Sequence, residues 1–306
     1  MDTRRASWAV GLCLLVVAAA AQAAERYKPF VLAYKGDGEV AAAMEAVAAK
    51  LAQAGFEVAG SYSPFPTATI LAITNDALKQ EAAKSEFGGY AAAQRVAITK
   101  VGEEVQVAYT NPTYMAHAYR LDGDLKAVSD KLAEALGREA EYGPDKAMTG
   151  KELRKYHYMF GMEYFDDPSL LAEHDSYEAA VQAVEAKLAE GVSGVGKVYR
   201  IDIPGKQETV FGVALRGGDE AKYQDDEYIM REIDFKPVRS TAHLPYEMLV
   251  SGNKVYALYA RFRIAINFPD LSMMGKHSFM NIMQSPAAIE RALTLAAGGT
   301  PRQSWE

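Results

Sequence analysis

Histidine, methionine and tyrosine occur together in three short segments of the chain, residues 114–119, 156–162 and 273–283. Three of the five histidines lie within four residues of a methionine. Imidazole and thioether groups are soft ligands that suit Cu(I), or a haem iron held by His and Met. The spacing therefore predicts a copper or non-covalent haem site. The predicted metal ligands are Met115, His117, His157, Met159, Met273, Met274 and His277.

The tyrosines of the same segments are predicted to contact a cofactor or a small apolar ligand. These residues are Tyr114, Tyr119, Tyr156 and Tyr158. The chain contains 18 Tyr and 11 Phe, and concave clefts lined by aromatic side chains are common ligand sites. Packing alone is the alternative explanation, because methionine fills irregular core gaps and His and Tyr often form hydrogen bonds at the edge of a sheet.

Conventional catalytic motifs are missing from the sequence. It contains no Gly-x-Ser-x-Gly elbow, no His-Glu-x-x-His and no Cys-x-x-Cys-His haem attachment site. The phosphate-binding motif Gly-x-x-x-x-Gly-Lys-Ser/Thr is incomplete, because residues 191–197 fit its first seven positions but Val198 takes the place of Ser or Thr. We therefore favour a non-enzymatic role and name no catalytic residue. The alternative is a periplasmic enzyme of unknown reaction with a dispersed His/Asp/Tyr site, since catalytic groups need not be close in sequence.

The N-terminus predicts export. Arg4 and Arg5 precede an apolar run over residues 8–21, and Ala21-Gln22-Ala23 matches a signal-peptidase site. Cleavage after Ala23 would leave a periplasmic protein without thiols, because Cys13 is the only cysteine. Disulfides, thiolate metal sites and cysteine nucleophiles are then excluded.

The net charge restricts the partners of the chain. The formal net charge is -7, which is unfavourable for binding nucleic acid or anionic membranes. Beyond the N-terminal run, no segment has the length and apolar character of a membrane span, so we expect no stable membrane insertion.

Two heptapeptides are nearly identical, AVAAKLA at residues 46–52 and AVEAKLA at residues 183–189. The apolar positions around them match at a constant offset and follow the spacing of one buried helix face. Val40, Met44, Val47 and Leu51 correspond to Tyr177, Val181, Val184 and Leu188. The sequence therefore predicts a duplicated domain.

Each predicted copy contains strands, helices and a hairpin in the order β-α-β-β-(α)-β-β-α. The first copy spans residues 24–137 and the divergent second copy 153–298. Between them lies a charged linker, 138–152, and residues 299–306 form a tail. In the second copy, residues 156–165 are predicted as an aromatic strand, residues 255–266 as the second hairpin strand, and the acidic stretch 217–237 as a solvated insertion.

The hairpins suggest a specific placement of two histidines. In the first copy, Asn111-Pro112 follows the hairpin and precedes His117. In the second copy, Asn267-Phe268-Pro269 precedes His277. We therefore expect His117 and His277 at equivalent positions.

The first copy resembles the domain-of-unknown-function family numbered 302. The resemblance lies in Ala54-Gly55-Phe56-Glu57-Val58, Ile70-Leu-Ala-Ile-Thr-Asn75, Arg95-Val-Ala-Ile98 and Val107-Ala-Tyr-Thr-Asn-Pro-Thr-Tyr-Met115. It implies a TATA-binding-protein-like β-α-β4-α fold of the α+β class with a curved antiparallel sheet, so two fused copies would be related by a pseudo-twofold axis. Two cysteines usual in the family are absent here, and the family has no established activity.

These observations together predict an exported, non-enzymatic binding or accessory protein. Its partner would be a small apolar ligand, a haem, a soft metal or a periplasmic protein. The chain would be a monomeric pseudo-dimer or would form a homo-oligomer.

Overall fold

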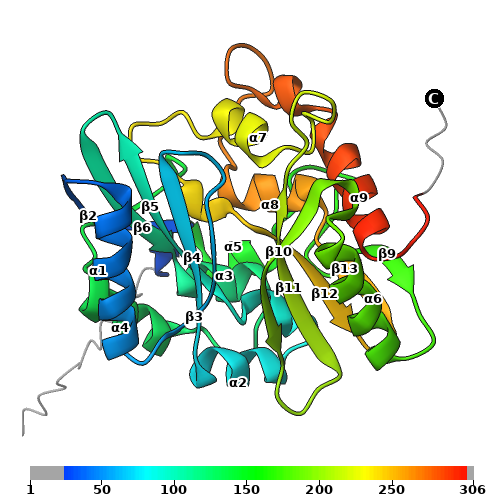
Figure 1. Cartoon of the computed structure of the whole chain (residues 1–306). Helices are drawn as coiled ribbons and strands as arrows, with labels where there is room; N and C mark the ends of the chain where they lie inside the picture. The colour runs from blue at the N-terminus through cyan, green and yellow to red at the C-terminus, as the bar shows by residue number, and fades with distance from the viewer. Residues whose placement is uncertain (1–23, 302–306) are drawn as a thin grey trace, which may run out of the picture.

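The computed structural model describes residues 24–301 and is a mixed α+β structure with two larger antiparallel sheets (Figure 1). The predicted signal peptide, residues 1–23, lies outside the described residues. The first sheet has six strands in the order β3-β4-β5-β6-β2-β7. Its strands are β2 (Phe30–Asp37), β3 (Glu57–Tyr62), β4 (Ala68–Thr74), β5 (Gln94–Val101), β6 (Glu104–Thr110) and β7 (Ala140–Tyr142).

The second sheet has five strands in the order β10-β11-β12-β13-β9. Its strands are β9 (Ser169–Glu173), β10 (Val195–Asp202), β11 (Glu208–Leu215), β12 (Tyr246–Ser251) and β13 (Lys254–Ala257). Apart from β7, the two sheets therefore have the same strand order. Two short strands, β1 (Arg26–Tyr27) and β8 (Met148–Thr149), form a separate pair.

Helices follow the strands in the same sequence in both parts of the chain. In the first half, from β2 to α4, they are α1 (Val40–Gln53), α2 (Asp76–Lys84), α3 (Pro112–Ala118) and α4 (Lys126–Leu136). In the second half, from β9 to α9, they are α6 (Tyr177–Ala189), α7 (Asp226–Ile233), α8 (Ala260–Asn267) and α9 (Ser285–Ala296). Helix α1 contacts α4, and α6 contacts α9, so each sheet has a pair of helices beside it.

The repeated heptapeptides lie in α1 and α6, where their apolar positions are buried as the spacing predicts. Val47 and Leu51 are fully buried in α1, and Val184 and Leu188 are buried in α6. Both predicted hairpins are also present. Strands β5 and β6 pair around residues 101–104, and β12 and β13 pair around residues 251–254.

The two sheets meet at their edge strands, β3 and β10, which lie side by side (Figure 1). Gly60 of β3 makes this approach possible, because a Cβ atom there would overlap the carbonyl oxygen of Val198 in β10. Glycine is suited to places where one backbone approaches another closely.

A buried ion cluster also joins the halves. Arg95 of β5 and Arg263 of α8 both pair with Glu247 of β12, and Arg263 Nε lies 3.3 Å from Glu247 Oε2. The three side chains are at most 2% exposed. Arg263 Nη2 also donates to the carbonyl oxygens of His243, at 2.6 Å, and Pro245, at 2.5 Å.

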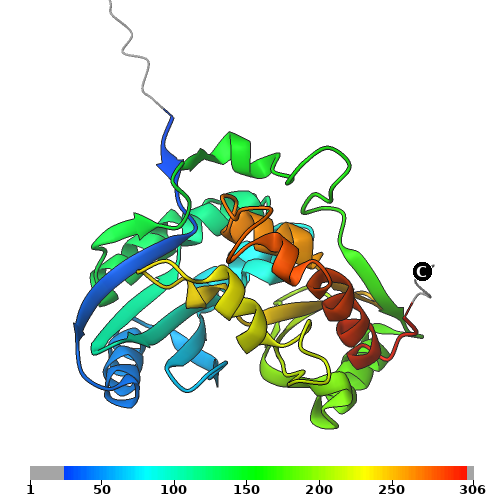
Figure 2. The ribbon, with the colours of Figure 1, turned by 90° about the horizontal axis from the view of Figure 1, so that it is seen from above.

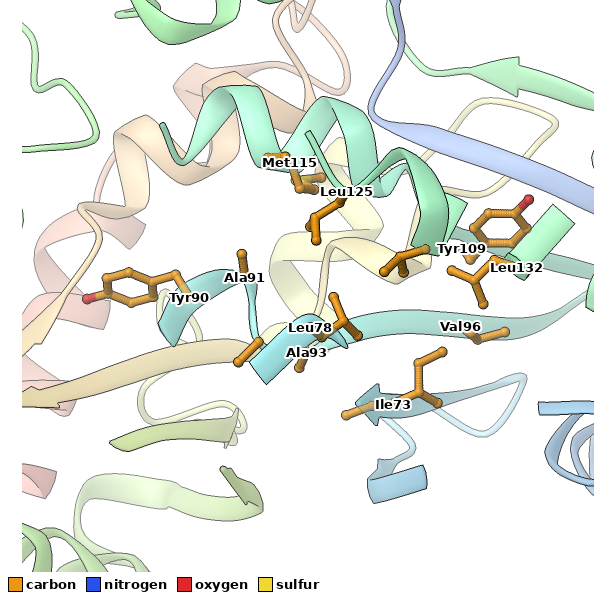
Figure 3. Close-up of a cluster of buried hydrophobic side chains, with 14 of the residues drawn as sticks. Ile73, Leu78, Tyr90, Ala91, Ala93, Val96, Tyr109, Met115, Leu125 and Leu132 are labelled. Atoms are coloured by element: carbon orange, nitrogen blue, oxygen red, sulfur yellow. The ribbon is translucent and has the colours of Figure 1, made fainter. Parts of the chain in front are cut away.

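The hydrophobic cores extend across the junction. The first core contains side chains from β4, α2, β5, β6, α3 and α4, several of which are shown in Figure 3. It also includes second-half residues, among them Tyr199, Val210, Leu249, Phe262 and Ile266. The second core in turn includes Phe30, Tyr62, Ile70 and Ala97 of the first half. Each half therefore completes the core of the other.

Residues 138–152, predicted as a linker, are folded. Strand β7 pairs with β2 at the edge of the first sheet, β8 pairs with β1, and α5 (Gly150–Arg154) follows. Thr149 and Glu152 form a capping box at the start of α5. Figure 2 shows the chain from β7 to β9 running along one side of the molecule, from the first half to the second.

Two predicted strands of the second half are wrong. Residues 156–165 contain no strand, and the first strand of this half, β9, begins only at Ser169. Tyr156 and Phe165 pack against Phe262 of α8 instead, with ring centroids 6.4 and 6.3 Å away. Strand β13 ends at Ala257 rather than continuing to residue 266, and α8 follows. Short apolar runs do not distinguish a buried strand from a buried helix by periodicity.

The acidic stretch 217–237 is only partly solvated, so this prediction is also wrong. It contains α7, and the carboxyl groups of Asp226 and Asp234 at the two ends of that helix are buried. Asp226 Oδ2 accepts hydrogen bonds from the Tyr62 hydroxyl at 2.6 Å and from the Leu215 amide at 2.8 Å. The segment thus contributes to the junction between the halves.

Candidate functional site

The three histidines predicted as ligands contact different aromatic rings. His117, in the last turn of α3, lies 5.5 Å from the ring of Tyr27. His157 lies 4.5 Å from the Tyr164 ring, and His277 stacks 4.8 Å from the Phe235 ring. Within residues 24–301, no group of three His, Cys, Asp or Glu side chains is placed to hold a metal ion.

His117 and His277 do not occupy equivalent positions. His117 is in α3, which directly follows the first hairpin. Helix α8 takes the corresponding place after the second hairpin, and Asn267 is its last residue rather than its cap. His277 comes later, in the loop between α8 and η4 (Phe279–Ile282). Asn111-Pro112 therefore lies at the start of α3, whereas Asn267-Phe268-Pro269 lies at the end of α8.

Three of the predicted cofactor-contacting tyrosines pack between the halves. The hydroxyl of Tyr114 donates to the carbonyl oxygen of Ile266 at 2.6 Å, and that of Tyr156 donates to Ala265 at 2.9 Å. Tyr119 stacks on Phe165 with ring centroids 5.3 Å apart. Burial raises the pKa of the Tyr114 and Tyr156 hydroxyls above their ordinary value.

Met115 is also part of this packing. It is 1% exposed and belongs to the first hydrophobic core (Figure 3). A thioether at this depth is closed to a ligand from solvent. His117 beside it is half-buried, and burial, together with the positive charge of Arg154, lowers its imidazole pKa.

Three of the other predicted residues, Tyr158, Met159 and Met273, line one groove, which we call the methionine groove. It lies between the loop after α5 and the segment from α8 to η4. The groove is lined by Tyr158, Met159, Met162, Arg261, Ile264, Ala265, Phe268, Leu271, Met273 and Phe279. Tyr158, Met159 and Met273 were predicted from the sequence. Met162, Phe268, Leu271 and Phe279 complete the groove, although none of them was predicted as a site residue.

A tight turn places two methionines of the groove. The amide of Met162 donates to the carbonyl oxygen of Met159 at 3.0 Å. Gly161, at φ +81°, supplies the left-handed backbone conformation that such a turn needs. His157 Nδ1 lies 2.8 Å from the same Met159 carbonyl, so Nδ1 carries the proton and donates it. The imidazole thereby holds the turn.

The opposite side of the groove is built by the segment after α8. The amide of Phe279 donates to Ser272 O at 2.8 Å, and that of Met280 donates to Met273 O at 3.2 Å. These bonds fold the segment back on itself and present Met273 to the groove. The Tyr158 hydroxyl, 2.8 Å from Met273 Sδ, connects the two sides.

The groove has an exposed apolar rim. Met159 and Met273 of the lining are 49% and 45% exposed, and their neighbours in the sequence, Phe160 and Met274, are fully and 71% exposed. Such clustered apolar side chains on a surface often mark an interaction site. Within residues 24–301, Arg261 is the single charged residue that lines the groove. Its guanidinium pairs with Glu163.

A larger and more polar cleft lies between the halves. It has a volume of about 650 Å³, and Lys100, Arg231, Asp234 and His277 are among its lining residues. Asp234 is buried, and burial raises the pKa of its carboxyl to about 7. Its Oδ1 accepts from the Ser240 amide at 2.8 Å, so this carboxyl holds the loop after α7.

The histidines form no pair suited to acid–base catalysis among the described residues. His157 is hydrogen-bonded to a backbone carbonyl, and no carboxylate or hydroxyl hydrogen bond is recorded there for His117 or His277. A nucleophile and its base must lie within hydrogen-bond reach of each other.

Comparison of the chain with models of known families, with curated proteins and with solved structures found no match. The resemblance to family 302 therefore stays a prediction. Within residues 24–301, no helix combines the length and the apolar character needed to cross a membrane.

Proposed function

We propose that this chain is an exported binding or accessory protein formed by two fused copies of a family-302-like domain with a TATA-binding-protein-like fold. Apart from β7, the two sheets have the same strand order, which supports the duplication, as do the matching heptapeptides in α1 and α6. In such an arrangement the second copy replaces the partner subunit of a homodimer, and a pseudo-twofold axis passes near the β3–β10 contact.

Export is supported by the basic start, the apolar run and the Ala21-Gln22-Ala23 site. N-terminal sequencing of the protein from its native host should begin at Ala24. A mature product that retains Met1 would contradict export by this route.

The observation that carries the binding role is the methionine groove with its exposed rim. Methionine side chains are flexible and polarisable, so a surface built from them adapts to apolar partners of varied shape. The free volume of the groove is about 60 Å³, whereas small-molecule pockets typically measure roughly 300–1,000 Å³. The groove is thus suited to one apolar side chain of a periplasmic protein, with the surrounding methionines contacting the rest of that partner.

Titration with the fluorescent apolar dye anilinonaphthalene sulfonate tests this binding surface. We expect saturable binding by the wild-type protein and at least about fivefold weaker binding by M159Q and M273Q, since each loses a buried apolar contact of roughly 1 kcal/mol. Glutamine has nearly the shape of methionine, so the groove keeps its form but becomes polar.

M283Q is the matched control, because Met283 is 57% exposed but does not line the groove. Its dye binding should equal that of the wild type. Equal binding by all four proteins would show that the groove is not the apolar site.

A further inference from the structure

We propose that the methionine groove binds a soft monovalent metal ion, Cu(I) or Ag(I), through the thioethers of Met159, Met162 and Met273. This inference rests on the proposed function, because it uses the same groove, and it adds a ligand class to the apolar contact surface. It also differs from the sequence-based prediction, since it excludes Met115, His117 and His277 and adds Met162.

The backbone brings the three methionine side chains to one groove from two distant segments. The turn at Gly161 sets Met159 and Met162 on a single loop, closed by the 3.0 Å hydrogen bond between them. Met273 faces this loop from the segment after α8. Two of the proposed ligands thus come from one turn and the third from a separate segment, so the site forms only when the chain is folded.

The chemistry of the lining selects the ion. Thioethers are soft and uncharged, and such ligands favour Cu(I) over hard or divalent cations. The lining residues include no carboxylate that would neutralise a divalent ion. The charge of Arg261 is compensated by Glu163, which places a carboxylate oxygen on each of two guanidinium nitrogens.

The Tyr158 hydroxyl orients one of the proposed ligands. It donates to Met273 Sδ at 2.8 Å and so fixes the direction of that thioether. A sulfur atom has two lone pairs, and one stays free for a metal. Hydrogen bonds that orient a ligand are typical of metal sites, and their loss usually weakens affinity about 10- to 100-fold.

Exposure distinguishes Met159 and Met273 from Met115, the methionine beside His117. Met159 and Met273 are each nearly half exposed, so an ion can reach them from solvent. Met115 is buried in the first core and has no such access. In the groove, several methionine side chains therefore lie together and are accessible to solvent.

Competition for Cu(I) with bicinchoninate, under anaerobic and reducing conditions, tests the proposal. The mature chain from Ala24 contains no cysteine, and protein that retains residues 1–23 carries C13S, so that no thiol can bind the ion. We expect one Cu(I) per chain, about tenfold weaker binding by Y158F, and a larger loss for each of M159L, M162L and M273L. M283L should bind like the parent protein. No uptake by the parent, or unchanged uptake by the triple leucine variant, would overturn the proposal.

The leucine variants separate this inference from the proposed function. Leucine removes the sulfur but keeps the groove apolar, so dye binding should persist while Cu(I) binding is lost. Groove-dependent dye binding without Cu(I) uptake by the parent would overturn the metal site alone. Groove-dependent Cu(I) uptake with dye binding unaffected by M159Q and M273Q would overturn the apolar surface alone. Circular dichroism of each variant confirms that the fold is retained.

Discussion

Glu247 is the anion shared by two buried arginines, Arg95 and Arg263. Replacing it by glutamine would leave two guanidinium groups without a countercharge in the interior. Removing one partner from a buried ion pair typically costs about 3–5 kcal/mol. We therefore expect E247Q to lower the free energy of unfolding in urea by that amount, or to prevent folding.

An exposed ion pair provides the control for this prediction. Lys126 and Asp130 pair on the surface of α4, with both side chains more than half exposed. Such pairs contribute little to stability. D130N should unfold at the urea concentration of the wild type, and an equally stable E247Q would show that the buried cluster does not hold the halves together.

Asp226 should make the stability of the protein depend on pH. Burial raises the pKa of its carboxyl from 3.8 to about 7, although the hydrogen bonds from Tyr62 and Leu215 act in the opposite direction. The folded protein thus retains a proton that the unfolded chain loses between these two values. The stabilising contribution is complete below pH 3.8 and disappears as the pH rises through about 7.

D226N removes this titration and keeps the shape of the side chain. Between pH 5 and 8, the melting temperature of D226N should therefore fall less than that of the wild type. E227Q changes the neighbouring exposed carboxylate and is the control, which should follow the wild type. A D226N profile parallel to the wild-type profile would contradict the assignment.

The candidate site could be predicted only in part. The sequence indicated His157, Met159 and Met273 through the local density of soft ligands, and these residues do lie at or beside one groove. It also indicated Met115, which is in the core, because composition does not report depth. Met162 belongs to the groove because of the turn at Gly161, and Phe279 because the segment after α8 folds back. Both depend on tertiary structure.

The contact between β3 and β10 depends on one residue without a side chain, Gly60. G60A would place a methyl group against the Val198 carbonyl and force the two edge strands apart. Overpacking of this kind typically costs about 1–3 kcal/mol. We expect a lower melting temperature and a lower urea midpoint for G60A.

Gly196 provides the matched control on β10 itself, because a Cβ atom there would contact nothing within 4 Å. G196A should have almost no effect on stability. Equal effects of the two substitutions would show that the edge strands do not restrict each other.

Hydrophobic periodicity predicted the amphipathic helices and the hairpins well, but it predicted the elements buried between the two halves poorly. Helices α1 and α6 have long apolar stripes, and the hairpins have clear turn residues, so local sequence suffices to define them. Helix α8 is buried over most of its surface, so it has no polar face to reveal its period and was predicted as a strand. Asp226 was predicted to be solvated because its partner, Tyr62, is 164 residues away in the sequence.

For the whole molecule, the shared cores predict that neither half is stable alone. The first core lacks Tyr199, Leu249 and Phe262 if the chain ends at residue 149. We expect residues 24–149 to show no cooperative unfolding transition in urea, and the full chain to show one. Mixing this fragment with residues 150–306 should restore the transition, whereas cooperative unfolding of the fragment alone would refute mutual dependence.

The shared cores also determine when the protein can reach its final form during synthesis. A ribosome releases the N-terminus first, yet the side chains that complete the first core extend to Ile266, near the end of the chain. The first half therefore stays incompletely folded until more than a hundred further residues have been synthesised. Under the proposed export as an unfolded chain, this delay would be an advantage, because folding before export would block passage across the membrane.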